Sequence, residues 1–436
     1  MKSVKLIEEK IFKLRAGGSK FSLEPMQNFA RLAGNPQNSY KIAHIAGTNG
    51  KGSTCAFIEG ILRALGLRVG MFTSPHLLKI NERVQINRQN ISDADFIDIF
   101  ESLDALANSV KKDAPRLAPT FFEYITTLAF EHFKRKRVDF AVVEVGLGGR
   151  LDATNIVRPD ICAITSIGFD HMQFLGETLP EIAAEKAGII KENTPVACGI
   201  LPDEAMRVIE KTAREKNAPL FKLEDYFTKN PVFDTSMQAH YQNKNAALAF
   251  LICEILGGMG KIKFDEAAAK DAILSAQWAA RWQKIPLKNG ATLILDCSHN
   301  AEGAAELEKN LQTLAKNSGG QKPIIACGIL GRERAVPLLK AASKYAKKIV
   351  FLVPKEDRAL SFEELKECMP ENGAPETENS EIKKLFPEKY LCQETNAGET
   401  IVCTGSCYLA GEVLARISGG ERDGLQDVIK NPAKKP

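Results

Sequence analysis

The sequence lacks three features, each of which would point to a particular class of protein. No apolar run reaches the roughly 20 residues that cross a membrane. The first 15 residues alternate charged and apolar side chains, whereas a secretory signal has a continuous apolar stretch. With 58 basic and 54 acidic residues, the chain also has no large excess of charge for holding nucleic acid or an anionic membrane. These absences predict a cytoplasmic protein that binds neither nucleic acid nor membrane.

The ten cysteines include no CxxC pair, the spacing that zinc sites and redox motifs use. They are scattered singly, mostly in apolar runs, which favours buried, reduced thiols over zinc ligands or disulfides. Only Cys403 and Cys407 are close in sequence, and the pattern places one at the end of a strand and the other at the start of a helix.

Segments rich in β-branched and apolar residues alternate with helical patterns along almost the whole chain. This alternation predicts an α/β fold with a mainly parallel sheet. The 436 residues suffice for about two to four domains, and a border is expected near Ile285, where a helical pattern ends. Strands are expected at 41–46, 68–73, 138–143, 160–166, 194–199, 291–295, 323–327, 348–353 and 399–404, and helices at 54–65, 94–109, 121–134 and 204–215.

The expected strand at 41–46 runs into a glycine-rich loop, and a helical pattern follows at once. Glycines let such a loop turn its N–H groups inward, the helix start adds positive partial charge, and Lys51 reaches the outer phosphates of a nucleotide. An ordinary glycine-rich turn is the alternative, but the combined features favour triphosphate binding. Because Gly52 separates Lys51 from Ser53, the metal-binding hydroxyl is expected from another segment. The predicted ATP-binding loop is Gly47, Thr48, Asn49, Gly50, Lys51, Gly52 and Ser53.

Residues 44–53, HIAGTNGKGS, resemble the ATP loop of the folylpolyglutamate and dihydrofolate synthases, which belong to the Mur ligase superfamily. A lone nucleotide loop is weak evidence, but the resemblance continues in order along nearly the whole chain. It implies a Mur ligase-type P-loop ATPase domain at 1–285 and a smaller, Rossmann-like C-terminal glutamate ligase domain at 286–436. The further matching segments are 73–77, 81–84, 144–155, 170–171, 185–188, 296–300 and 404–408.

The expected metal ligands follow predicted strands. Glu144 closes an apolar strand and so stands where ligands bind parallel sheets, although a solvated rim residue would look the same. His171 follows the next strand, where it would otherwise cap a helix or satisfy a core hydrogen bond. The resemblance implies that Ser74, Glu144 and His171 bind Mg²⁺. It also implies that Lys186, which would otherwise be an ordinary helix lysine, is carboxylated by carbon dioxide.

The resemblance assigns four further residues to the nucleotide: Asn245 to the base, Arg281 to phosphate, and Asp296 and His299 to further nucleotide contacts. Asn245 would otherwise belong to a helix cap, and Arg281 would be a solvated linker residue. Two segments depart from the family pattern. Residues 296–300 read Asp-Cys-Ser-His-Asn in place of Asp-Gly-Ala-His-Asn, and 279–281 read Ala-Ala-Arg in place of Pro-Gly-Arg.

The resemblance places a pteroate pocket at two segments. An aromatic ring such as Phe122 can stack on a flat pterin while an acid bonds its nitrogens, and core packing is expected for one of the two phenylalanines. Residues 150–155 resemble the bifunctional bacterial members, which favours dihydropteroate as a substrate. The pocket residues are Thr120, Phe121, Phe122, Glu123, Leu151, Asp152 and Ala153, and the catalytic residues are Lys51, Lys186 and His171.

The resulting hypothesis is a monomeric, ATP-dependent amide ligase that forms an acyl phosphate. With Mg²⁺ it would join L-glutamate to dihydropteroate and to the γ-glutamyl tail of tetrahydrofolate. Three alternatives stay open: a synthase that only lengthens the tail, another Mur-type ligase that acts on a cell-wall precursor, and a nucleotide-dependent switch. The cell-wall alternative is disfavoured because about 40 residues precede the ATP loop, fewer than a typical domain.

Overall fold

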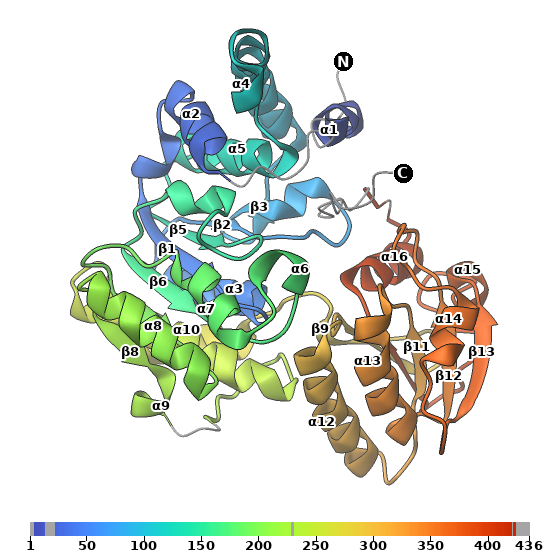
Figure 1. Ribbon diagram of the computed structural model, residues 1–436. Helices are drawn as coiled ribbons and strands as arrows, with labels where there is room; N and C mark the ends of the chain where they lie inside the picture. The colour runs from blue at the N-terminus through green and yellow to red at the C-terminus, as the bar shows by residue number, and fades with distance from the viewer. Residues whose placement is uncertain (1–3, 14–21, 228–230, 421, 424–436) are drawn as a thin grey trace.

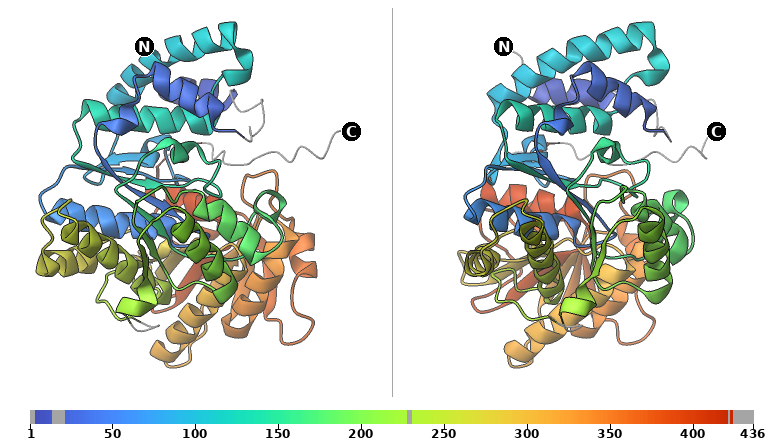
Figure 2. Two further views of the ribbon diagram at one scale, coloured as in Figure 1. Left: turned by 60° about the vertical axis from the view of Figure 1, so that its left-hand side comes forward. Right: turned by 90° about the vertical axis from the view of Figure 1, so that its left-hand side faces the viewer.

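The computed structural model describes residues 4–13, 22–227, 231–420 and 422–423. Two sheets follow one another along the chain, and each forms a lobe with helices on both faces (Figure 1). The N-terminal helices lie at the end of the first lobe that faces away from the second (Figure 2). The predicted α/β fold is confirmed.

The first sheet has eight strands in the order β4-β3-β2-β5-β1-β6-β7-β8. β1 is central and pairs in parallel with β5 and β6, whereas β3 and β4 join the edge antiparallel. The register aligns Ile45 with Glu144 and Ala46 with Ile164, so the carboxyl ends of the three central strands meet at one edge. The strands are β1 (Lys41–Ala46), β2 (Val69–Phe72), β3 (Val84–Ile86), β4 (Gln89–Asn90), β5 (Phe140–Glu144), β6 (Ile161–Ile164), β7 (Val196–Cys198) and β8 (Leu220–Lys222).

Alternate side chains of these strands enter different cores. Ala43 and Ile45 belong to the core under α3 (Lys51–Ala64), α10 (His240–Gly258) and α11 (Glu266–Ser275). Ile42 belongs to the core on the opposite face, under the N-terminal helices. The other helices of this lobe are α1 (Val4–Lys13), α2 (Glu24–Leu32), α4 (Asp93–Asp113), α5 (Phe121–Arg135), α6 (Met172–Leu175), α7 (Leu179–Ala187), α8 (Asp203–Glu215) and α9 (Leu223–Tyr226), with short 3₁₀ helices η2 (Pro36–Asn38), η3 (Ile80–Arg83), η4 (Pro115–Leu117) and η5 (Ala153–Ile156).

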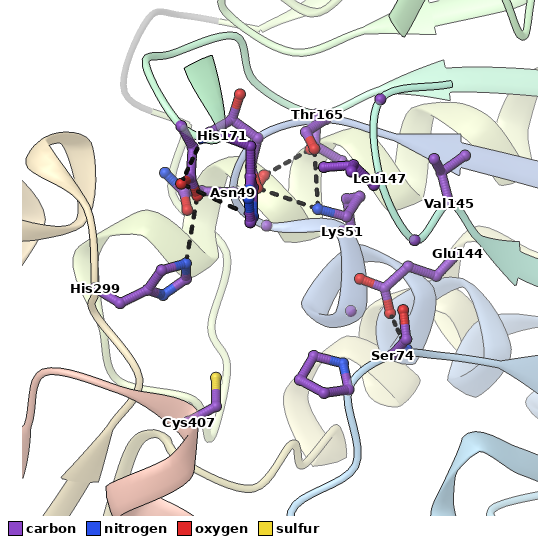
Figure 3. A pocket seen from close by; sticks show the side chains of 18 of the residues that line it. Asn49, Lys51, Ser74, Glu144, Val145, Leu147, Thr165, His171, His299 and Cys407 are labelled. Atoms are coloured by element: carbon purple, nitrogen blue, oxygen red, sulfur yellow. Dashed lines mark hydrogen bonds and ion pairs between the residues drawn. The ribbon is translucent and has the colours of Figure 1, made fainter. Parts of the chain in front are cut away.

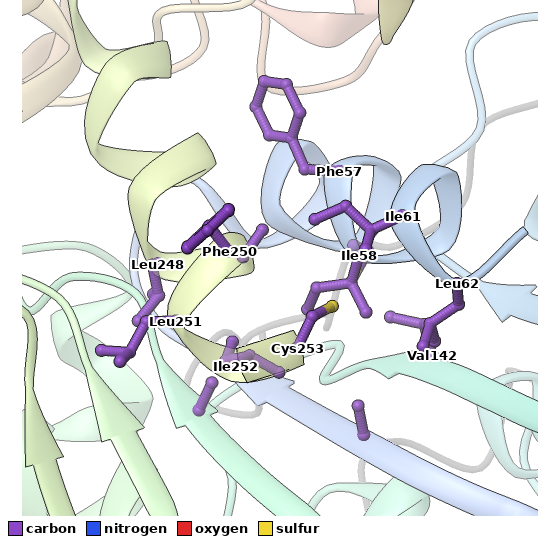
Figure 4. Close-up of a cluster of buried hydrophobic side chains, with 14 of the residues drawn as sticks. Phe57, Ile58, Ile61, Leu62, Val142, Leu248, Phe250, Leu251, Ile252 and Cys253 are labelled. Carbon is purple, nitrogen blue, oxygen red and sulfur yellow. The ribbon is translucent and has the colours of Figure 1, made fainter. Parts of the chain in front are cut away.

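Helix α3 is held against α10 and the sheet by apolar packing (Figure 4). Phe57 and Ile58 of α3 are fully buried, as are Leu251 and Ile252 of α10. This packing fixes the start of α3, and therefore the glycine loop that precedes it.

Replacing Phe57 with alanine is expected to cost about 3–5 kcal/mol of unfolding free energy, because it leaves a cavity in this core. Denaturant unfolding, followed by circular dichroism, measures the loss. The control is Leu274→Ala on α11, whose side chain is 50% exposed and whose loss should be far smaller. Equal losses in the two variants would contradict the packing described.

The second sheet has six strands in the order β13-β12-β11-β14-β10-β9, all parallel except the edge strand β9. Helices α12, α13 and α14 pack on one face, and α15 and α16 on the other. The elements are β9 (Arg281–Pro286), β10 (Thr292–Asp296), β11 (Ile324–Cys327), β12 (Lys348–Leu352), β13 (Glu376–Ser380), β14 (Thr400–Thr404), α12 (Ala301–Asn317), α13 (Arg332–Tyr345), α14 (Phe362–Glu367), α15 (Ile382–Leu385) and α16 (Cys407–Ser418).

The structure differs from the sequence predictions at element edges and short strands. The border expected near Ile285 falls inside β9, because Ile285 pairs with Leu293 and the second sheet therefore starts at Arg281. Helix α3 starts at Lys51, three residues before the expected start. The sequence predicted neither the short strands β3, β4 and β8 nor the edge strands β9 and β13, whose polar residues lack the apolar pattern of a buried strand.

Over the described ranges, no helix combines the length and apolar character needed to span a membrane. All ten cysteines are free thiols, as the sequence predicts. Nine are buried, and Cys407 is the half-buried exception.

Candidate active site

A cavity of about 1100 Å³ lies where the carboxyl ends of β1, β5 and β6 meet loops of the second lobe (Figure 3). Both lobes line it, so residues more than 200 positions apart in the chain share one site. All seven residues of the predicted ATP-binding loop line this cavity.

The glycine loop joins β1 to the N-terminus of α3. Gly50 has φ 87° and caps the helix, and Gly47 has φ 149°. A Cβ atom on Gly47 would lie 1.9 Å from Thr165 Oγ1, so only glycine fits there. Lys51 Nζ donates to the carbonyl oxygens of Gly47 and Thr48 at 2.9 and 3.1 Å. The loop therefore presents a lysine and a helix N-terminus to the cavity, which suits a polyphosphate.

Glu144 and Ser74 lie together at the ends of β5 and β2. Glu144 Oε2 accepts a hydrogen bond from the Ser74 backbone N–H at 3.1 Å. Burial raises the pKa of Glu144 to about 7, although the charge of Lys51 opposes the rise. A buried carboxylate and a nearby hydroxyl residue are hard oxygen donors of the kind that Mg²⁺ prefers, so the two residues could hold this ion.

His171, the third predicted metal ligand, lines the same cavity as the N-cap residue of α6. Burial lowers its pKa to about 4, although Asp170 opposes the change. A neutral imidazole can bind a metal ion. Among the described residues, no three His, Cys, Asp or Glu side chains converge as a preformed metal cluster.

Asp170 links the two lobes. Its carboxylate accepts a hydrogen bond from Arg334 Nη2 at 2.7 Å and from Asn300 Nδ2 at 3.1 Å, and it lies 3.5 Å from His299 Nε2. Against the effect of burial, its interactions with His299, His171 and Arg334 lower the pKa of Asp170. Burial lowers the pKa of His299, but the hydrogen bond and the charge of Asp170 raise it by more, so the net shift is upward.

Lys186 lies near the end of α7 and lines the cavity with only 3% of its surface exposed. Burial lowers its pKa to about 7, and the positive charge of Lys51 adds to the effect. The residue is therefore not an ordinary solvated helix lysine.

Asn245 lines the cavity from within α10, which starts at His240, so it is not the cap residue that the simpler interpretation suggests. Its side chain packs over Gly50 and donates to Gln242 Oε1 at 3.0 Å. Gln242 in turn donates to Ser53 Oγ at 3.2 Å. This chain of contacts connects α10 directly to the ATP-binding loop.

The second lobe contributes Arg281 and His299 to the cavity wall, but Asp296 lies behind it. Asp296 is fully buried and accepts hydrogen bonds from Ser298 N and Oγ, Trp282 N and Tyr241 Oη. It therefore positions the loop that carries His299. Ala280 has φ 53°, so the backbone keeps a left-handed conformation where the family pattern has glycine.

The predicted pteroate residues line the cavity near Gly146, although they do not contribute equally. Phe121 is the core residue of the phenylalanine pair, with 4% exposure, whereas the half-buried Phe122 packs over Gly146. Glu123 caps α5 by accepting from Thr120 N at 2.6 Å. Asp152 accepts from Leu147 N at 2.9 Å and caps η5. The other lining residues of this part are Thr120, Leu151 and Ala153.

Sequence reasoning missed Glu302 and Arg334, two residues of the second lobe that bind the first lobe beside the ATP-binding loop. Asn49 Nδ2 donates to Glu302 Oε2 at 2.7 Å, and Asn49 and Asn300 exchange amide hydrogen bonds at 3.2 and 3.0 Å. Arg334, which binds Asp170, comes from α13. Glu302 lies just after His299 and Asn300 in the sequence, which is a weak sign that it belongs to the site. No sequence pattern marks Arg334 as a site residue.

The comparisons with known proteins agree with this geometry. The family model for the Mur ligase middle domain matches residues 45–255. A dihydrofolate synthase/folylpolyglutamate synthase of Bacillus subtilis (strain 168) is 32% identical over 433 residues, which cover 92% of this chain and 97% of that protein. The chain belongs to the dihydrofolate synthase/folylpolyglutamate synthase family.

Solved structures of this family share the fold. A folylpolyglutamate synthase from Thermotoga maritima has a TM-score of 0.81 at 28% identity, covering 96% of this chain and 98% of that one. FolC from E. coli, in complex with DHPP and ADP, has a TM-score of 0.80 at 26% identity, with 96% and 98% covered. The resemblance stated from the sequence motifs is thus confirmed, and the chain is an ATP-dependent ligase of this family.

Proposed function

We propose that this ligase adds L-glutamate to 7,8-dihydropteroate and to the γ-glutamyl tail of tetrahydrofolate, using ATP. The observation that carries the proposal is the match over 97% of a relative whose name contains both activities. The site supports it, because one cavity joins the ATP-binding loop to a wall that contains the aromatic ring of Phe122.

In the first step, a carboxylate oxygen of the folate substrate attacks the γ-phosphorus of ATP. The bond from that phosphorus to the β–γ bridging oxygen breaks, which yields an acyl phosphate and ADP. We propose that the loop N–H groups, Lys51 and Arg281 hold the phosphates, while Asn245 contacts the base. The positive groups stabilise the charge that develops on the transferring phosphate oxygens.

Mg²⁺ would be held by Ser74 and Glu144, with His171 as a further ligand. When bound, it neutralises phosphate charge that the lysine and the arginine alone leave uncompensated. The neutral state that burial favours for His171 is the form able to donate its ring nitrogen to a metal.

In the second step, the amine of L-glutamate attacks the acyl carbon. The bond from that carbon to the phosphate oxygen breaks, inorganic phosphate leaves, and the nitrogen loses a proton as the amide forms. An acyl phosphate hydrolyses if water reaches it, so the site must exclude water during this step. Two contacts join the lobes around the site, from Asn49 to Glu302 and from Asp170 to Arg334. We propose that they keep the two lobes closed over the intermediate.

The test is phosphate release from ATP with Mg²⁺ and L-glutamate, comparing dihydropteroate, tetrahydrofolate and no acceptor. We expect release with both acceptors and an amide product of the corresponding mass. Release with tetrahydrofolate alone would reduce the function to tail lengthening. Slow release that neither acceptor stimulates would instead favour a different Mur-type ligase or a nucleotide switch.

We propose that Lys186 is carboxylated, because its environment favours the reactive amine. The neutral amine attacks carbon dioxide and loses a proton to form a carbamate, so carboxylation should increase as the pH rises through about 7, the pKa of Lys186. Carbon-13 NMR with labelled bicarbonate at pH 8 should show a carbamate signal that Lys186→Ala removes.

The matched control is Lys191→Arg. Burial lowers the pKa of Lys191 too, but this residue is not among those that line the cavity, so its replacement should leave the carbamate signal unchanged. Wild-type protein without a signal at pH 8, or a signal that survives in Lys186→Ala, would refute the assignment.

The expected monomeric state and location in the cytoplasm remain predictions. Size-exclusion chromatography with light scattering tests the first, and fractionation of cells tests the second.

A further inference from the structure

Two cysteines, Cys297 and Cys407, line the wall of the cavity, although 110 positions separate them in the chain. Strands β10 and β14 are parallel neighbours whose register aligns Leu295 with Cys403. Cys297 is the first residue after β10, and Cys407 is the first residue of α16, just after β14. The Gly405 N–H donates to the Ser298 carbonyl oxygen at 3.2 Å and ties the two loops together.

The two thiols lie close enough for each to shift the pKa of the other. Cys297 is 5% exposed and Cys407 is half-buried. Figure 3 shows the Cys407 side chain on the same side of the cavity as His299, with its sulfur pointing into the open space. Within the described part of the chain, these are the two cysteines that line the cavity.

The surroundings of Cys407 favour its thiolate, which is the nucleophilic form. The hydrogen bond from Cys297, together with the charges of Arg281 and His299, lowers the pKa of Cys407 against the effect of burial. The same contact raises the pKa of Cys297, so Cys407 is the attacking sulfur of the pair.

We propose that Cys297 and Cys407 form a thiol–disulfide modification site for small-molecule disulfides. The Cys407 thiolate attacks one sulfur of R–S–S–R, the S–S bond breaks, and one thiolate RS⁻ leaves. Cys297 then gives up its proton and attacks the Cys407 sulfur, which releases the second RS⁻. The two protein thiols are oxidised to one disulfide, and the small disulfide is reduced to two thiols.

Disulfide formation should inhibit the ligase, an effect that rests on the proposed function. The Cys297 carbonyl oxygen lies 2.8 Å from Nδ1 of His299, and the charge of Arg281 acts on Cys407. Drawing the two sulfurs into a covalent bond shifts both groups of the nucleotide wall. A misplacement of about 1 Å lowers rates by about 100-fold.

The experiment treats the full chain with oxidised glutathione, then blocks the remaining thiols and maps peptides without reduction. We expect a disulfide between the peptides of Cys297 and Cys407, a fall in acceptor-dependent phosphate release of about 100-fold, and recovery with dithiothreitol. Bound ATP with Mg²⁺ should slow the reaction, because phosphates then occupy Arg281.

Two variants test the order of attack. Cys297→Ser should keep one glutathione on Cys407, because the second sulfur is missing, whereas Cys407→Ser should take up none at Cys297. The control is Cys368→Ser, at the end of α14 outside the cavity, which should form the disulfide like the wild type.

The failures of the two proposals are distinguishable. Wild-type protein that forms no Cys297–Cys407 disulfide overturns the site, whatever the ligase activity, since mapping needs no substrate. A disulfide that leaves acceptor-dependent release unchanged overturns the inhibition. If reduced protein shows no acceptor-dependent release, the proposed function fails while the peptide map still decides the modification site.

Discussion

Replacing Lys51 with alanine should lower kcat for ligation by about 1,000-fold or more, because the transferring phosphate loses a positioned cation in a low-dielectric site. Lys51 Nζ contacts only the loop carbonyl oxygens of Gly47 and Thr48 in the hydrogen bonds given above, so its removal disturbs little packing. The fold should therefore survive, and circular dichroism should match the wild type. Steady-state phosphate release with both acceptors measures the effect.

The matched control for this variant is Lys211→Ala on α8, whose side chain is 77% exposed. This change should leave kcat within about twofold, as for other solvated lysines. A Lys51→Ala enzyme that keeps a tenth or more of wild-type kcat would remove the loop lysine from the mechanism, and with it the main support for phosphate transfer at this site.

The second large effect is expected for Glu144→Gln. This change keeps the size of the side chain and the contact with the Ser74 N–H, but it removes the charge that would hold Mg²⁺. We expect kcat to fall by about 100-fold and the Mg²⁺ concentration for half-maximal rate to rise, as the loss of a metal ligand predicts. Rates measured over a Mg²⁺ titration separate the two changes.

The pH dependence of the wild-type enzyme gives a second, independent test of Glu144 as a metal ligand. Burial raises the pKa of Glu144 to about 7. Below that pH a growing fraction of the Glu144 side chains is protonated, and a protonated carboxyl binds Mg²⁺ poorly. The Mg²⁺ requirement should therefore increase as the pH falls below about 7, and Glu144→Gln should lack this dependence. The control is Glu59→Gln, a buried carboxyl with a raised pKa that does not line the active-site cavity. An unaltered Mg²⁺ requirement in Glu144→Gln would contradict the metal assignment.

Local sequence patterns predicted the central strands of the first lobe. The strand at 41–46 has the bounds that the structure shows, because a buried parallel strand needs a continuous apolar run and the glycines mark its end. The threonine and glutamate at 120 and 123 also carry a local signal, the capping box, in addition to their predicted place in the pteroate pocket. In the structure, Glu123 bonds the Thr120 N–H as that local pattern predicts.

By itself, then, the sequence determined the α/β class, the ATP-binding loop and the family, since these depend on residues close together in the chain. Only the tertiary structure decided the burial of Lys186, the link from Asp170 to Arg334 and the contact of Cys297 with Cys407. The two pairings depend on which strand ends and lobes meet in the fold. The burial of Lys186 depends on the packing that keeps water away from its side chain. A pattern along the chain carries no such information. Asp170 and Arg334 are 164 positions apart and Cys297 and Cys407 are 110 apart, and the desolvation that lowers the pKa of Lys186 comes from tertiary packing.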